Sequence, residues 1–250
     1  MKLLMENWRN YLNDELLNEG PYDQGIFRAV FLAGGPGSGK SFVASHTTGG
    51  QGWKVSNSDQ PFEYLMGKAG LSLNMTDLSP EEEAAKDRVR IRAKGLSAQR
   101  RQAWCDGRLG QVIDGTGAKL DKIATLRKQY EDMGYDTYMI FVNTSLAAAK
   151  KWNLKRERSV REDILENSWQ AVQDNMGNFQ QLFGQNNFVI VDNTPDSVLG
   201  TQGASPEDLE KIWNVINADF AMRPITNPIA REWLDKKIGV CPIKRPKLRS

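Results

Sequence analysis

The chain has 250 residues, of which 40% are hydrophobic and 26% charged, and its formal net charge is +2. These values fit one large globular domain with short appendages, and the near balance of charge points to no class of partner. Cys105 and Cys241 lie far apart without a C-x-x-C spacing, which argues against a disulfide framework or a zinc site and favours a reducing cytoplasm. No apolar run reaches membrane-spanning length, so we expect no membrane partner.

Residues 1–20 are predicted to form an amphipathic helix, because apolar side chains recur on one face until Gly20 and Pro21 end the pattern. Packing of this helix on the core is one interpretation. The segment also resembles the head-targeting peptides of tailed bacteriophages, and Leu17-Asn18-Glu19 before Gly20 matches the Leu-x-Glu site cleaved during their maturation. That resemblance implies a phage protein in the host-cell cytoplasm, packaged in the phage head and in contact with head proteins.

The next segment predicts a phosphate-binding loop. An apolar run over 26–33 has strand length, residues 34–41 match G-x-x-x-x-G-K-[ST], and a helix can start at Ser41. Glycines let the backbone N–H groups turn inward around an anion, and the N-terminus of the helix adds partial positive charge. Lys40 is expected to reach the β- and γ-phosphates of ATP and Ser41 to hold Mg²⁺. The other nucleotide-binding candidates here are Gly35, Pro36, Gly37, Ser38, Gly39 and Phe42.

Further strands are predicted at 53–56, 111–113, 138–142 and 188–191. Helices are predicted at 62–70, 81–106 and 118–133, across a long helical region over 145–183, and from Ser205 to Ala221. This alternation predicts an α/β fold of the P-loop NTPase type, with a parallel five-stranded sheet, helices on both faces and a helical lid. We expect the kinase domain to span 25–222 and a C-terminal extension with a basic tail to span 223–250.

Two carboxylates follow predicted strands, whose carboxyl ends form the ligand-binding edge of such a sheet. Asp114 ends an apolar strand, as the Mg²⁺-associated aspartate of P-loop proteins does, although Asp-Gly is also turn chemistry. Asp59 follows the second strand and is the candidate to accept the proton of an attacking hydroxyl; a helix cap before Pro61 is the alternative interpretation. Gly115 stands where ATP-hydrolysing motors usually carry Glu, which favours transfer over hydrolysis.

An arginine cluster lies between the fourth and fifth strands. Arg156, Arg158 and Arg161 can bridge phosphate oxygens from a lid that closes over ATP. The lid arginines are either Arg156 with Arg158 or Arg158 with Arg161. Neighbouring acids could instead pair with these arginines on a solvated helix face.

The order GGPGSGKS, Asp59, IDGTG, R-x-R-S-V and VDNT resembles the small P-loop kinases of the zeta-toxin and polynucleotide-kinase group. The resemblance implies ATP- and Mg²⁺-dependent transfer of the γ-phosphate to a hydroxyl on a nucleic-acid end or a nucleotide sugar. It gives catalytic roles to Asp59, Lys40, Arg156 and Arg158, metal contacts to Ser41 and Asp114, and positions near adenine to Asn193 and Thr194. Two departures are Phe62, where polynucleotide kinases of this group carry Arg, and Asp114-Gly115-Thr116, where zeta toxins have Glu-Gly-Thr.

The alternative function is a nucleic-acid-associated nucleotide-binding protein or ATPase carried by a phage. Its contact surface would be the arginine-rich helix 81–106 and the basic tail Lys244–Arg249, both suited to phosphate backbones.

Overall fold

The computed structural model describes residues 21, 23, 25–48, 52–73, 79–155, 160–194, 210 and 212–238. The predicted N-terminal helix with its cleavage pattern, the lid arginines Arg156 and Arg158, and the basic tail lie outside the described residues, so these expectations stay predictions. Within the described part of the chain, no helix is both long and apolar enough to cross a membrane.

Five parallel strands form one sheet in the order β2-β3-β1-β4-β5. They are β1 (Arg28–Ala33), β2 (Lys54–Ser56), β3 (Gln111–Asp114), β4 (Asp136–Asn143) and β5 (Phe188–Asp192). Each lies where an apolar, β-rich run predicted it, because parallel strands buried on both faces read as continuous apolar segments. The predicted α/β fold is confirmed.

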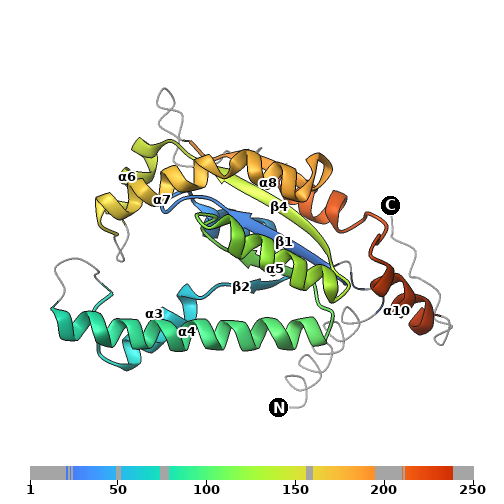
Figure 1. Cartoon of the computed structure of the whole chain (residues 1–250), viewed down its shortest axis with the longest axis horizontal. Helices are drawn as coiled ribbons and strands as arrows, with labels where there is room; N and C mark the ends of the chain where they lie inside the picture. Colours follow the sequence, from blue (N-terminus) through green and yellow to red (C-terminus); the bar gives the residue numbers. More distant parts are fainter. Residues whose placement is uncertain are drawn as a thin grey trace, which may run out of the picture.

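Successive residues of β1 pack on opposite faces of the sheet. Phe31 belongs to a core shared with α5 (Leu120–Asp132), α7 (Glu162–Asp174) and α8 (Met176–Phe183). Val30 and Leu32 belong to a second core shared with α2 (Lys40–Thr48) and the π-helix η2 (Asn214–Phe220). Helices therefore cover both faces, as Figure 1 shows.

Beyond β2, at the edge of the sheet, α3 (Asp59–Lys68) packs on the long helix α4 (Pro80–Asp106). A small core of Phe62, Met66 and Ala93 joins the two helices. Helix α3 begins three residues earlier than the sequence predicted, so Asp59 is its first residue rather than the end of a strand.

The long helical region predicted over 145–183 is three helices. Helix α6 (Leu146–Leu154) ends before the segment that carries the arginine cluster, and a break at Asn175 separates α7 from α8. Asn153 joins the two sides of the first break: its amide nitrogen donates to the Val160 carbonyl at 2.7 Å, and its amide oxygen accepts from the Val160 N–H at 3.0 Å.

The C-terminal segment closes the amino end of the sheet, at the opposite end of the molecule from α6 (Figure 1). Asp136, the first residue of β4, accepts from the N–H and hydroxyl of Thr226 at 2.7 Å each. In α10 (Pro228–Ile238), Trp233 packs edge-on against Phe27, with ring centroids 5.5 Å apart. Residues on both sides of the predicted boundary at 222 thus share one core.

Candidate active site

The loop between β1 and α2 has the backbone of an anion cradle. Gly37 and Gly39 take φ values of +75° and +84°, which only glycine adopts without strain. A Cβ atom at Gly37 would lie 2.5 Å from the Ala149 carbonyl oxygen, and one at Gly39 would collide with the Asn193 amide. The geometry thus requires glycine at these two places.

Lys40 folds back over this loop. Its Nζ donates to the carbonyl oxygens of Gly34 at 2.6 Å and Gly35 at 3.0 Å, and lies 3.3 Å from Ser38 Oγ. A phosphate can compete with these carbonyls, because it adds attraction between two opposite charges to the hydrogen bond. The ammonium group is therefore held where a phosphate in the cradle would meet it.

Asn193, which follows β5, fixes the cradle from the other side. Its Nδ2 donates to the Ser38 carbonyl at 2.7 Å, and its backbone N–H donates to the Asn143 carbonyl at 2.8 Å. The side chain is buried, and its Oδ1 has no hydrogen-bond partner among the described residues. Thr194 contacts the N-cap residue of α6, because its hydroxyl accepts from the Ser145 N–H at 3.1 Å.

Asn57 joins the carboxylate of Asp114 to the backbone of Asp59. Register places Leu32 beside Asp114, and the Gly34 N–H donates to the Thr116 carbonyl at 3.0 Å, so β3 ends against the phosphate loop. Asn57 Nδ2 donates to Asp114 Oδ2 at 2.8 Å, and Asn57 Oδ1 accepts from the Asp59 N–H at 2.6 Å.

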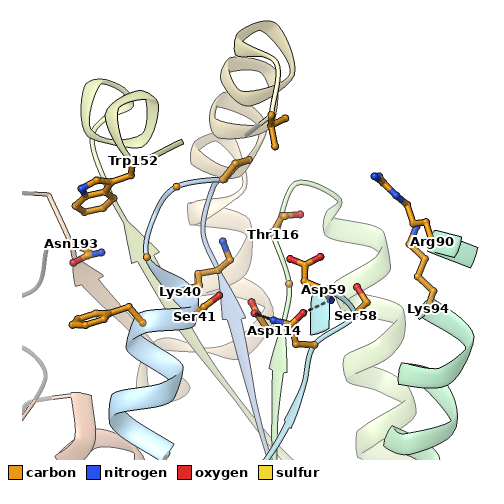
Figure 2. A pocket seen from close by; sticks show the side chains of 17 residues that line it. Lys40, Ser41, Ser58, Asp59, Arg90, Lys94, Asp114, Thr116, Trp152 and Asn193 are labelled. Carbon is orange, nitrogen blue, oxygen red and sulfur yellow. Dashed lines mark hydrogen bonds between the residues drawn. The ribbon is translucent and has the colours of Figure 1, made fainter. Parts of the chain in front are cut away.

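A cavity of about 790 Å³ opens over the carboxyl ends of the strands, and Figure 2 shows the side chains that line it. Pro36, Gly37, Gly39, Lys40, Ser41, Phe42, Asp59, Asp114 and Asn193 line it among the residues predicted from the sequence. The structure adds residues that the sequence did not single out as site residues: Asn57, Ser58, Arg90, Lys94, Thr116, Trp152 and Val160.

The donor set suits Mg²⁺ bound together with a nucleotide. Ser41 and Asp114 offer a hydroxyl and a carboxylate on the cavity wall, and Mg²⁺ prefers one or two such oxygens completed by water and phosphate oxygens. Among the described residues, no group of three or more His, Cys, Asp or Glu could hold an ion without such help.

Arg161 does not line the cavity in the structure. It is exposed, precedes α7, and forms an ion pair with Asp163 at 2.6 Å. The hydrogen bond from this pair raises the pKa of Arg161 and lowers the pKa of Asp163. Its neighbour Val160 lines the cavity, whereas Arg161 does not. The role predicted for Arg161 stays a prediction.

Comparisons with known proteins place these features in a family. The family model of the AAA domain matches residues 30–179. No curated protein matches the chain. Among solved structures, the AvrRxo1-ORF1:-ORF2 complex with ATP is 15% identical over 87% of this chain and 74% of that chain, with a TM-score of 0.52.

Two further solved structures have lower TM-scores. The Pnkp1/Rnl/Hen1 RNA repair complex is 19% identical over 62% of this chain and 46% of that chain, with a TM-score of 0.47. The PezAT toxin–antitoxin system of Streptococcus pneumoniae is 13% identical over 85% of this chain and 86% of that chain, also at 0.47. Identities this low bear on the fold alone. The family match covers more than half of the chain and contains the whole phosphate loop, so the chain belongs to the AAA domain family.

Proposed function

We propose that this protein is a phosphotransferase that moves the γ-phosphate of ATP to a hydroxyl group. The observation that carries the proposal is one cavity in which Lys40 and the glycine loop stand on one side and Asp59 on the other. This arrangement pairs an anion cradle with a carboxylate able to take a proton, which are the two parts that phosphoryl transfer needs.

In the proposed reaction, the loop N–H groups and Lys40 bind the phosphates of ATP and stabilise the charge on the transferring group. The acceptor oxygen forms a bond to the γ-phosphorus as the bond from this phosphorus to the β–γ bridging oxygen breaks. The hydroxyl proton passes to the Asp59 carboxylate, and ADP leaves. Mg²⁺ held by Ser41 and Asp114 would neutralise phosphate charge when bound.

The nucleotide base has a separate place in the cavity. Trp152 of α6 lies on the Asn193 side of the phosphate loop, away from Asp59 (Figure 2), and the half-exposed Phe42 of α2 also lines the cavity. Aromatic faces are suited to stacking on a purine. We infer that adenine binds here, which agrees with the position near adenine predicted for Asn193.

The test is incubation with γ-labelled ATP and Mg²⁺ against nucleosides, nucleotide sugars, 5′-hydroxyl oligonucleotides and proteins. Lys40→Ala is expected to lower transfer by about a hundredfold or more, because it removes a donor aimed at developing charge. Asp59→Asn is expected to lower the rate by about 10²–10⁴-fold, the usual contribution of a general base, while ATP binding persists.

Glu63→Gln is the matched control, since Glu63 lies one turn further along α3, is exposed and does not line the cavity. It should transfer at the wild-type rate. Full activity of Asp59→Asn would contradict the assignment of the base. Release of labelled inorganic phosphate with no labelled acceptor would make the protein a hydrolase instead.

A second candidate function rests on the exposed arginines of α4. Arg88, Arg92, Arg100 and Arg101 are not fully buried, and a surface of this kind can contact a phosphate backbone. A nucleic-acid-binding protein that uses ATP as a switch would bind oligonucleotides with a steep salt dependence and label no acceptor.

A further inference from the structure

We propose that Arg90 and Lys94 form a binding site for a phosphate group of the acceptor, so that the hydroxyl receiving the γ-phosphate belongs to a molecule that already carries phosphate. The inference rests on the proposed phosphotransfer and names its substrate class.

The first support is that Arg90 and Lys94 lie on the face of α4 that lines the cavity. Six basic residues and no acid occur between Arg88 and Arg101, yet only Arg90 and Lys94 line the cavity. They are four residues apart and therefore share one face of the helix. Arg88 and Arg92, on the same turns, are exposed outside the cavity.

The second support is that this face is fixed against the catalytic groups. Ser97, one turn beyond Lys94, is buried and its hydroxyl donates to the Asn57 carbonyl at 3.0 Å. Asn57 in turn holds Asp114 and the Asp59 N–H. Ala93 packs in the small core with Phe62. Helix α4 thus holds its two cations in a constant position relative to Asp59.

The third support is the surroundings of Arg90. Its guanidinium lies over the Phe62 ring, 5.4 Å from the centroid, and the side chain is half-buried. Among the described residues, no carboxylate forms an ion pair with Arg90 or Lys94. Partial burial of a charge without a counter-ion costs free energy, which an anionic ligand would recover. The aromatic face orients the planar group for a bidentate contact with phosphate.

The fourth support is the direction from which the acceptor must come. Figure 2 shows Asp59 between Lys40 and the pair of Arg90 and Lys94, whereas Trp152 and Asn193 lie on the opposite side of Lys40. ATP bound with its base at Trp152 would point its γ-phosphate toward Asp59. The cations therefore lie beyond the reacting hydroxyl, on the acceptor side. Ser58 and Thr116 offer hydroxyl groups to the same region.

The experiment compares acceptors that differ by phosphate. Adenosine is paired with adenosine 3′-monophosphate, and N-acetylglucosamine with its 1-phosphate, which separates a nucleotide type of acceptor from a sugar type. We expect kcat/KM to be about ten- to a hundredfold higher for the phosphorylated member of at least one pair, the usual value of a charged hydrogen bond. Arg90→Ala and Lys94→Ala should each remove most of that preference and leave the KM for ATP unchanged.

Lys68→Ala, at an exposed cation of α3 outside the cavity, is the matched control and should retain the preference. Equal loss of kcat for neutral and phosphorylated acceptors in Arg90→Ala would overturn the proposal, because it would place Arg90 on the γ-phosphate. Calorimetric binding to protein saturated with a non-hydrolysable ATP analogue provides a second readout. Binding of the neutral members as tightly as the phosphorylated ones would also overturn it. If the wild type transferred phosphate to no acceptor but still bound the phosphorylated acceptors more tightly, only the proposed function would be contradicted.

Discussion

Asn57 makes three contacts with three different elements of the site. Its amide joins the carboxylate of Asp114 to the backbone of Asp59, and its carbonyl accepts from Ser97 of α4. One residue thus joins, through its side chain and its backbone carbonyl, the group proposed to contact Mg²⁺, the proposed base and the helix proposed to hold the acceptor. Asn193 is its counterpart on the nucleotide side, where it holds the phosphate loop through Ser38.

Substitution of Asn57 should mainly affect kcat, whereas substitution of Asn193 should mainly affect the binding of ATP. We expect Asn57→Ala to lower kcat by about a hundredfold, because a misplacement of reacting groups by about 1 Å costs that much, with little change in the Kd for ATP. Asn193→Ala should instead weaken ATP binding, because the loop loses the hydrogen bond that holds its shape. Steady-state kinetics and calorimetry on both variants measure this contrast. Similar effects of the two substitutions on kcat and Kd would refute the division of roles.

Residues whose arrangement follows from local backbone geometry could be predicted from the sequence. Gly37, Gly39 and Lys40 belong to one contiguous motif, so their spacing determines their arrangement. Arg90 and Trp152 could not be assigned in this way. A charged helix residue and a tryptophan each have a commoner solvated or packing role, and only the tertiary placement of α4 and α6 brings them to the cavity.

At the scale of elements, the stability of α4 depends on the cap at its N-terminus as well as on packing. Ser79 accepts from the Glu82 N–H at 3.2 Å, and the Glu82 carboxylate accepts from the Ser79 N–H at 3.0 Å, which forms a capping box. The hydrogen bond from the Ser79 N–H lowers the pKa of Glu82. Only Lys86, Ala93, Ser97 and Cys105 of this helix are buried, so its cap matters for its position.

Ser79→Ala is therefore expected to lower the free energy of unfolding by about 1 kcal/mol, the usual value of an N-cap hydroxyl. Urea denaturation followed by circular dichroism measures the change. Gln99→Ala, at an exposed position in the same helix, serves as the control and should stay within about 0.5 kcal/mol of the wild type. An unchanged stability of Ser79→Ala would show that packing alone holds α4.

The elements differed in how well the sequence predicted them. The apolar strands were correctly placed because burial on both faces leaves a plain pattern. Helix α10 was assigned to an extension, although Ala230, Trp233 and Leu234 follow helical spacing and pack in the core. Basic residues surround this short apolar face, so the sequence pattern of α10 was interpreted as part of a basic extension. Asn175 and Gly177 lie at the break between α7 and α8 and both are poor helix formers, but the prediction treated residues 145–183 as one helical region.

At the scale of the molecule, a buried polar cluster lies between α4, β3 and α5. Gln111 donates to Cys105 Sγ at 3.2 Å and accepts from the Tyr130 hydroxyl at 2.7 Å. Burial is the main cause that raises the pKa of Cys105, and burial likewise raises the pKa of Tyr130 and of Tyr135. The folded protein therefore keeps these groups protonated at pH values where the unfolded chain loses their protons.

Stability should accordingly fall in alkali. For an acid whose pKa is raised by folding, the unfolded state binds fewer protons above the ordinary value, which is 9.0 for Cys105, so the free energy of unfolding decreases with pH from there. The slope from one thiol cannot exceed about 1.4 kcal/mol per pH unit. Urea denaturation between pH 7 and 10 should show a shallower decline for Cys105→Ala than for the wild type.

The comparison has an internal control. Below about pH 8 the Cys105 thiol stays protonated in both the folded and the unfolded protein, so the stability curves of Cys105→Ala and the wild type should run parallel. Parallel curves up to pH 10 would mean that the thiol ionises as readily in the folded protein as in the unfolded chain.

The contacts between the C-terminal segment and the amino end of the sheet have a consequence for dissecting the chain. A fragment that stops at residue 222 would keep every described residue of the cavity yet expose the ring of Phe27 to water and leave the carboxylate of Asp136 without Thr226. Such a fragment is expected to be less soluble although it keeps the residues of the cavity. Expression trials should therefore retain the chain through Ile238 even when only the cavity is of interest.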